Sequence, residues 1–127
     1  MNKIPDISDT ELLVMKVLWN ESPLTSTKII SNLKTNKPWS PKTIHTLISR
    51  LLKKGALSVN KNTTPYEYTP LVTEKEVQVY ETRSFLHRIY DGSLKMLLNN
   101  FIEDENLSND DISELKKILE ENLNGGE

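Results

Sequence analysis

The sequence predicts a mainly α-helical fold with one small β-hairpin. Ser8 and, three residues later, Glu11 have the spacing of a capping box, which marks the start of a helix. Thr73 and Glu76 repeat this pattern in the second half of the chain. Between the two boxes, residues 66–69 read Tyr-Glu-Tyr-Thr, and this alternation is typical of a half-buried strand.

Three helices are expected before the hairpin. The first begins at the capping box, and Pro23 closes it. Thr25 is a suitable cap for the second helix. Ser40 caps the third, with Pro41 at the first helical position, where the missing N–H costs nothing. Gly55 stands where a left-handed residue ends a helix.

The hairpin is expected to contain two short strands, at residues 56–61 and 66–69. The polar triplet Asn62-Thr63-Thr64 is the expected turn between them. Pro70 is expected to stop the pairing, because proline has no N–H to donate.

Three more helices are expected after the hairpin. The first runs from the second capping box to about Asp91, with Gly92 as its stop. Ser93 starts a short helix, and Ser108 caps the last one.

The charge is distributed unevenly between the two halves of the chain. Residues 1–72 contain ten Lys or Arg against five Asp or Glu, and residues 73–127 contain six against thirteen. No carboxylate occurs between Glu21 and Glu67, while that interval holds eight Lys or Arg. This is either ordinary surface charge that is unevenly spread or a surface that meets a polyanion; a nearby carboxylate would repel phosphate. Because charge sign and structural type change together, we predict a domain boundary near residue 72.

The third predicted helix has two distinct faces. At about 100° per residue, its core-facing residues are Ile44, Leu47, Ile48, Leu51 and Leu52. Its other face contains hydroxyls, cations and one histidine, suited to base edges and phosphate oxygens: Lys42, Thr43, His45, Thr46, Ser49, Arg50 and Lys53. The alternative is a solvated helix face that binds nothing.

The short turn before this helix, residues 35–39, gives a helix-turn-helix arrangement, and the hairpin that follows makes it a winged helix. We therefore predict a winged helix-turn-helix that binds double-stranded DNA, with Thr43, His45 and Thr46 contacting base edges. The expected backbone contacts come from cations and from hydroxyls at helix starts. The complete predicted DNA-binding set is Thr25, Ser26, Ser40, Lys42, Thr43, His45, Thr46, Arg50, Lys53 and Lys61.

The acidic second half carries apolar stripes on its last two helices. They consist of Leu94, Leu97, Leu98, Phe101, Ile112, Leu115, Ile118 and Leu119. Short helices bury little surface alone, so we predict that this segment, residues 73–127, dimerises. The alternative is that it packs on the winged helix of its own chain.

The stretches WSPKTIHTLISRLLKKG, ISDTELLVMKVLW and VYETRSFLHRIYDGSLKMLLNNFIEDENLS resemble the BlaI/MecI family of bacterial penicillinase and methicillin-resistance repressors, over about residues 7–121. The resemblance implies a homodimeric repressor that binds dyad operators in promoters of β-lactamase or related resistance genes and of its own operon. It also implies inactivation by a membrane sensor-protease that detects β-lactam. The cleaved bond would join Asn100 and Phe101 in LLNNFIEDE.

The sequence departs from this family at His45, a position that is commonly Arg in close relatives. Arginine can bind guanine bidentately, whereas a neutral histidine offers one donor and one acceptor, so operator preference is open. Copper-responsive relatives carry cysteine clusters near the C-terminus, and this chain has no cysteine. That branch is therefore excluded.

Other function classes have little support in the sequence. No glycine-rich phosphate loop or metal-ligand spacing appears, and His45 and His87 are the only histidines, so we expect no enzyme activity, cofactor or metal. No signal peptide or membrane span is evident, which predicts a cytoplasmic protein without membrane insertion. Two alternatives stay open: a repressor of this family that controls another regulon, and a winged helix that binds only proteins.

Overall fold

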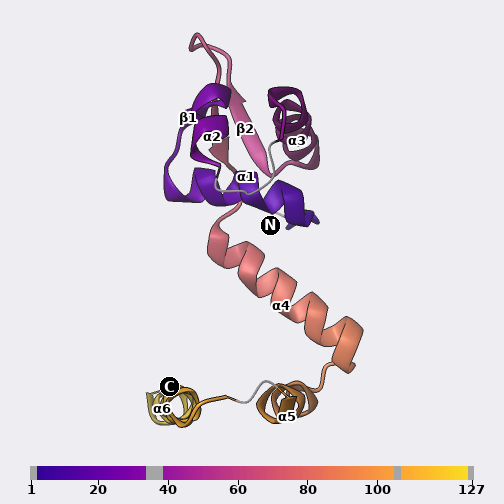
Figure 1. Cartoon of the computed structure of the whole chain (residues 1–127), viewed down its shortest axis with the longest axis vertical. Helices are drawn as coiled ribbons and strands as arrows, with labels where there is room; N and C mark the ends of the chain where they lie inside the picture. Colours follow the sequence, from indigo (N-terminus) through magenta and orange to yellow (C-terminus); the bar gives the residue numbers. More distant parts are fainter. Residues whose placement is uncertain (1–2, 34–38, 105–106, 126–127) are drawn as a thin grey trace. The chain divides into compact units, whose positions relative to one another are not determined.

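The computed structural model describes residues 3–33, 39–104 and 107–125. The chain forms two compact units, Met1–Glu81 and Thr82–Glu127, which we call the N-terminal unit and the C-terminal unit. Mainly helical structure with a small antiparallel sheet confirms the predicted fold class (Figure 1).

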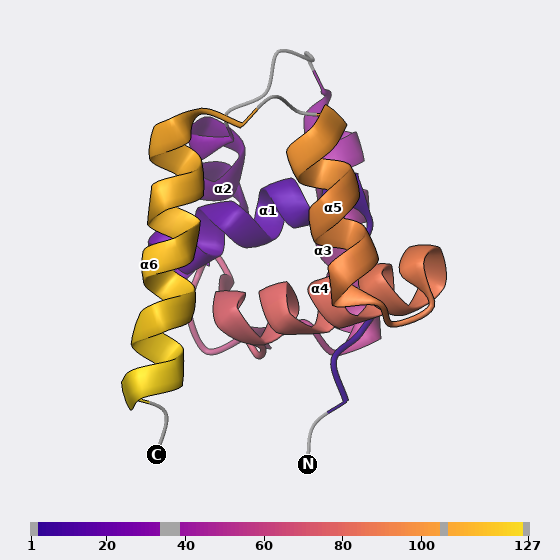
Figure 2. The ribbon, with the colours of Figure 1, turned by 90° about the horizontal axis from the view of Figure 1, so that it is seen from below.

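The N-terminal unit contains helices around a small sheet. Helix α1 contacts α2, α3 and strand β3. Figure 2 shows α1 beside α2. The unit also includes the first turns of helix α4, which continues beyond it. In chain order the elements are α1 (Asp9–Asn20), β1 (Leu24–Thr25), α2 (Ser26–Asn32), α3 (Pro41–Lys54), β2 (Leu57–Asn60), β3 (Glu67–Pro70) and α4 (Glu74–Tyr90).

The predicted caps begin and end these helices. Ser8 Oγ accepts a hydrogen bond from the Glu11 amide at 3.2 Å, and Glu11 Oε1 accepts one from the Ser8 amide at 2.9 Å. Ser40 caps α3 by accepting from the Thr43 amide at 3.2 Å. Gly55, with φ of 83°, ends α3 in the left-handed region that favours glycine. Each such N-cap typically contributes about 1 kcal/mol.

The sheet has three antiparallel strands in the order β1-β3-β2. The hairpin was predicted, but β2 is shorter than expected by one residue at each end, and β3 has the expected length and is shifted by one residue. The expectation that Pro70 stops the pairing is wrong, because Pro70 pairs with Leu57 as the last residue of β3. Antiparallel pairs alternate between hydrogen-bonded and open positions. In the next pair, Leu71 and Ala56, the Leu71 amide donates a hydrogen bond to the Ala56 carbonyl at 2.8 Å. Pro70 and Leu57 therefore form a non-hydrogen-bonded pair, in which Pro70 needs no N–H.

The core of the N-terminal unit lies between α1, α2, α3 and the sheet. Its buried residues are Val14, Met15, Leu18, Leu24, Ile29, Ile44, Leu47, Ile48, Leu51, Ala56, Leu57, Val72 and Val77. Val77 belongs to α4, and the Trp19 indole N–H donates to the Val72 carbonyl at 2.9 Å. The N-terminal unit therefore continues past residue 72 and includes the first turns of α4.

The C-terminal unit consists of the end of α4 followed by α5 (Leu94–Asp104) and α6 (Asn109–Gly125). Gly92, at φ of 86°, follows α4 as predicted. Ser93 caps α5 by accepting from the Met96 amide at 3.1 Å, and Ser108 caps α6 by accepting from the Asp111 amide at 3.1 Å. None of the described helices is long and apolar enough to cross a membrane.

Candidate nucleic-acid interface

Helix α3 separates an apolar face from a polar one, as its sequence predicts. Ile44, Leu47, Ile48 and Leu51 are buried in the core, and Leu52 is half-buried against it. The opposite face is exposed and has no carboxylate: Lys42, Thr43, His45, Thr46, Ser49, Arg50 and Lys53. The core contacts thus hold one side of α3 firmly and leave the other free to enter a groove.

The hydroxyls of this face already make local hydrogen bonds. Thr43 Oγ1 and Ser40 Oγ lie 3.1 Å apart, and Thr46 Oγ1 donates to the Lys42 carbonyl at 3.0 Å. A hydroxyl that donates once can still accept through its lone pairs. Thr46 can therefore still accept a hydrogen bond, and in the Ser40–Thr43 pair one hydroxyl donates to the other, so the accepting hydroxyl keeps its own proton for a further partner.

The predicted backbone contacts come from two further places in the N-terminal unit. Thr25 and Ser26, at the start of α2, are half-buried, and Thr25 Oγ1 accepts from the Lys28 amide at 3.3 Å. Lys61 is exposed in the hairpin turn, next to Asn60, whose side chain accepts from the Asn62 amide at 2.9 Å. Figure 1 shows α3 beside the hairpin. The turn predicted at residues 35–39 lies outside the described residues except for Trp39.

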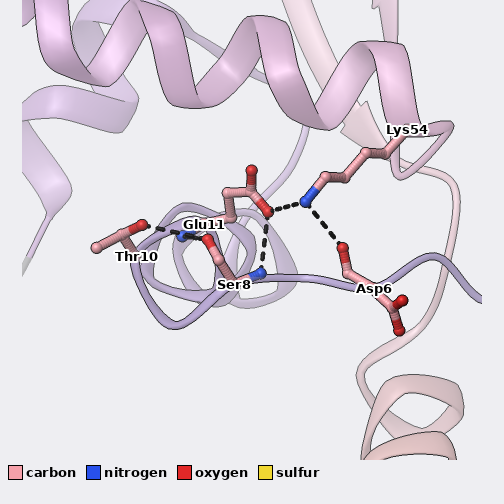
Figure 3. A network of polar contacts seen from close by, with 5 residues as sticks. All are labelled: Asp6, Ser8, Thr10, Glu11 and Lys54. Atoms are coloured by element: carbon pink, nitrogen blue, oxygen red, sulfur yellow. Dashed lines mark hydrogen bonds and ion pairs between the residues drawn. The ribbon is translucent and has the colours of Figure 1, made fainter.

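Lys54 is exposed like its neighbour Lys53, but its charge is paired within the N-terminal unit. Its ammonium contacts Glu11 Oε1 at 2.5 Å and the main-chain oxygen of Asp6 at 2.9 Å (Figure 3). Sequence reasoning missed this ion pair. A signal was present, because Glu11 precedes Val14 and Leu18 on the buried side of α1.

Glu11 is only 2% exposed, and among the residues that the structure describes it is the one charged residue in the buried class. Burial by itself raises the pKa of Glu11, but the hydrogen bonds from Lys54 and Ser8 outweigh it and hold the pKa below its ordinary value of 4.5. Glu11 is therefore ionised at neutral pH and neutralises a cation at the C-terminal end of α3. The negative charge is thus turned inward, away from the exposed face of α3.

The predicted dimerisation residues lie on α5 and α6 of the C-terminal unit. Within the single chain α5 has no buried residue, and Phe101 is 50% exposed. Leu94, Ile112, Ile118 and Leu119 are also exposed, and Leu97, Leu98 and Leu115 are half-buried. Asn100, on the predicted cleavage bond, is exposed. Most of the residues of the apolar stripes predicted from sequence are thus exposed, and the others are only partly covered by the described residues.

Among residues 3–33, 39–104 and 107–125, no group of three or more His, Cys, Asp or Glu side chains could hold a metal ion.

The chain matches the model of the family described as Penicillinase repressor over residues 7–121. The chain belongs to the penicillinase repressor family. It is thus a member of a family of transcriptional repressors, not enzymes.

Individual members of the penicillinase repressor family match nearly the whole chain. The penicillinase repressor of Bacillus licheniformis is 45% identical over 124 residues, which cover 98% of this chain and 97% of the relative. The methicillin resistance regulatory protein MecI of Staphylococcus aureus (strain N315) is 39% identical over 118 residues, covering 93% of this chain and 96% of the relative.

Two solved structures of BlaI resemble the winged-helix part of this family member. The DNA-binding domain of the repressor BlaI, in solution, is 47% identical with a TM-score of 0.52. Monomeric Bacillus licheniformis BlaI in complex with the blaP half-operator is also 47% identical, with a TM-score of 0.51. Each match covers 60% of this chain and 93% of the solved chain. They confirm the winged-helix fold predicted from sequence.

Proposed function

We propose that this chain is a cytoplasmic, homodimeric transcriptional repressor that binds dyad operator DNA in promoters of β-lactamase-type resistance genes and of its own operon. The observation that carries the proposal is the exposed, carboxylate-free face of α3 on a winged helix. A relative with 47% identity in this region has been solved on half-operator DNA, which supports the same use of α3 here.

In this proposal α3 lies in the major groove. Thr43, His45 and Thr46 contact base edges, while Lys42, Arg50 and Lys53 contact phosphates on either side. Lys61 of the hairpin, with Ser40, Thr25 and Ser26, adds backbone contacts. A neutral histidine offers a single donor and a single acceptor, so the base preference at His45 differs from that of an arginine at the same position.

Dimerisation supplies the specificity that one helix lacks. A single α3 reads few base pairs, whereas two copies spaced by about one helical turn, ~34 Å, read both half-sites of a dyad. The mostly exposed stripes of α5 and α6 are the proposed contact with the second copy. Large exposed apolar faces of this kind mark association surfaces in soluble proteins.

Proteolysis is the proposed release mechanism. A membrane sensor-protease that detects β-lactam would cut between Asn100 and Phe101 of α5, and the N-terminal product would lose Phe101 together with all of α6. Phe101 and α6 contribute five of the eight residues of the proposed dimer stripe, so the cut would separate the two DNA-binding units. Mass spectrometry of the chain from β-lactam-treated cells would show a fragment that ends at Asn100; a chain that stays intact while the promoter is induced would contradict this mechanism.

The function itself is tested by footprinting the purified full chain on the DNA upstream of its own gene. The expected result is protection of two half-sites related by a dyad, with their centres about one helical turn, or a multiple of it, apart. Binding without sequence preference, seen only at very low salt, would instead favour the winged helix that binds only proteins.

Replacing Thr43 with alanine is expected to weaken operator binding by about 0.5–1.5 kcal/mol per half-site, the range for one lost hydrogen bond, and to leave binding to random DNA nearly unchanged. The Ser40 cap survives this change because it uses the main-chain N–H of residue 43. Thr43→Ser is the matched control, since it keeps the hydroxyl. Equal losses on operator and random duplexes in fluorescence anisotropy titrations would remove Thr43 from the base-reading set.

Replacing Lys53 with alanine is expected to weaken binding to all DNA sequences alike, because its proposed partner is a phosphate. The slope of log affinity against log salt should become shallower by about one unit per protomer. The measurement is a titration of operator and random duplex at several salt concentrations. An unchanged slope would contradict the phosphate assignment.

A further inference from the structure

Asp6, in the segment before α1, contacts two elements that are far apart in the sequence. Its main-chain oxygen accepts a hydrogen bond from Lys54 Nζ, at the C-terminal end of α3, at 2.9 Å (Figure 3). Its carboxylate oxygen Oδ1 accepts one from the Tyr80 hydroxyl, on α4, at 2.7 Å. One residue therefore links the helix that faces the proposed DNA site to the helix that leads into the C-terminal unit.

Helix α4 and the residues just before it contact the rest of the N-terminal unit. The Val72 carbonyl, two residues before α4, accepts the Trp19 indole N–H; Val77 is buried in the core, and the Tyr80 hydroxyl donates to Asp6. The hydrogen bond to Asp6 is the main cause that raises the pKa of Tyr80, which is consistent with a phenol that donates to a carboxylate. The contact of Tyr80 lies further along the chain than those of Val72 and Val77, one residue before the unit ends at Glu81.

The contact furthest from the start of a helix controls its direction most strongly. From Tyr80 to the end of α4 at Tyr90 the helix spans about 15 Å, at 1.5 Å per residue. A change in tilt of about 10° then moves the end of α4 by about 3 Å, close to the 3.4 Å rise along the DNA axis per base pair. A change of this size in the direction of α4 is therefore comparable to one base-pair step.

We propose that Asp6 and Tyr80 are positioning residues for operator recognition: their hydrogen bond fixes the direction in which α4 leaves the DNA-binding unit, and so the separation of the two α3 helices in the dimer. This inference rests on the proposed function, because it concerns a dimer that binds a dyad. Neither side chain needs to contact DNA. Their hydrogen bond determines which spacing between the two half-sites the dimer binds most tightly.

The test uses the full chain with Tyr80→Phe, which removes the hydroxyl and keeps the ring. Binding is measured on a duplex with one half-site, on the dyad operator, and on dyads with one base pair added to or removed from the spacer. We expect unchanged half-site affinity, operator affinity lower by about 3- to 10-fold, as for one lost hydrogen bond, and a smaller preference for the natural spacing.

Three comparisons make the result specific. Asp6→Ala should reproduce the loss, and the double variant should lose no more than either single variant, because both remove the same contact. Tyr90→Phe, which removes a hydroxyl from α4 without touching Asp6, should bind as the parent does. Thermal unfolding of every variant shows whether the fold is kept.

The outcomes separate the two proposals. A parent chain that binds neither duplex overturns the proposed function and this inference with it. A parent that binds while Tyr80→Phe keeps its operator affinity and spacing preference overturns this inference alone. Equal losses on half-site and dyad would mean that the contact only supports the fold, and they overturn it as well.

Discussion

Replacing Lys54 with alanine is expected to lower the free energy of unfolding of the N-terminal unit by about 3 kcal/mol at pH 7, the low end of the range for breaking a buried ion pair. The variant leaves the Glu11 carboxylate, only 2% exposed, without its cation. Glu11→Gln should cost less, because the Lys54 side chain that it leaves unpaired is 36% exposed and can be hydrated. Urea unfolding followed by tryptophan fluorescence measures both, since Trp19 and Trp39 lie in this unit.

The pH dependence identifies the buried carboxylate as the cause. In the parent the pKa of Glu11 is lowered, so its contribution to stability is present above its ordinary value of 4.5 and is lost as pH falls through the folded-state pKa. Without Lys54 burial dominates and raises that pKa, so the penalty is largest at neutral pH and is relieved by protonation. The stability difference between parent and Lys54→Ala should therefore shrink from pH 7 to pH 4.

Lys53→Ala is the matched control, because it removes the same side chain one position earlier. Lys53 is exposed, and surface substitutions usually change the free energy of unfolding by less than about 0.5 kcal/mol. The two substitutions should have different effects. Lys53→Ala should change DNA binding and its salt dependence, and Lys54→Ala should lower the free energy of unfolding. A Lys54→Ala variant as stable as the parent at pH 7 would show that the ion pair contributes little.

Features that depend on neighbours in sequence could be predicted, and features that depend on distant partners could not. The Ser40 cap, Gly55 and the two-faced α3 follow from local spacing, and the structure contains all three. Strand β1 has only two residues and exists because Leu24 pairs with Tyr68, far along the chain, so no local alternation announces it. The same holds for the ion pair of Lys54. The sequence does not distinguish Lys54 from Lys53, and the pair forms only because α1 packs on α3 and brings Glu11 to Lys54.

The candidate site shows the same division. Periodicity predicted which side chains of α3 are exposed, and the structure bears this out from Lys42 to Lys53. Which of them contact bases is a property of the DNA complex, so Thr43, His45 and Thr46 stay predictions. The stripes of α5 and α6 were also found from their spacing, yet their partner is, in our proposal, a second copy that no single chain contains.

Replacing Leu119 with aspartate is expected to abolish dimerisation and to weaken binding to the dyad operator by about 100-fold, the low end of the gain from linking two binding units. Leu119 is 51% exposed on α6, within the proposed dimer stripe. A carboxylate there would be buried without a partner when two copies meet, and burying an unpaired charge costs several kcal/mol. Sedimentation should show a monomer at micromolar concentration, while affinity for a single half-site stays unchanged.

Lys117→Asp provides the control for this result. Lys117 is exposed on the same helix but outside the apolar stripe, so the variant gains negative charge on α6 without placing it in the proposed contact. It should stay dimeric and bind the dyad as the parent does, apart from a small effect of net charge. If both variants weaken operator binding equally, the cause is repulsion between α6 and DNA. If Leu119→Asp stays dimeric, the stripe of α6 is not the contact between copies, and operator specificity must arise from another arrangement of the two DNA-binding units.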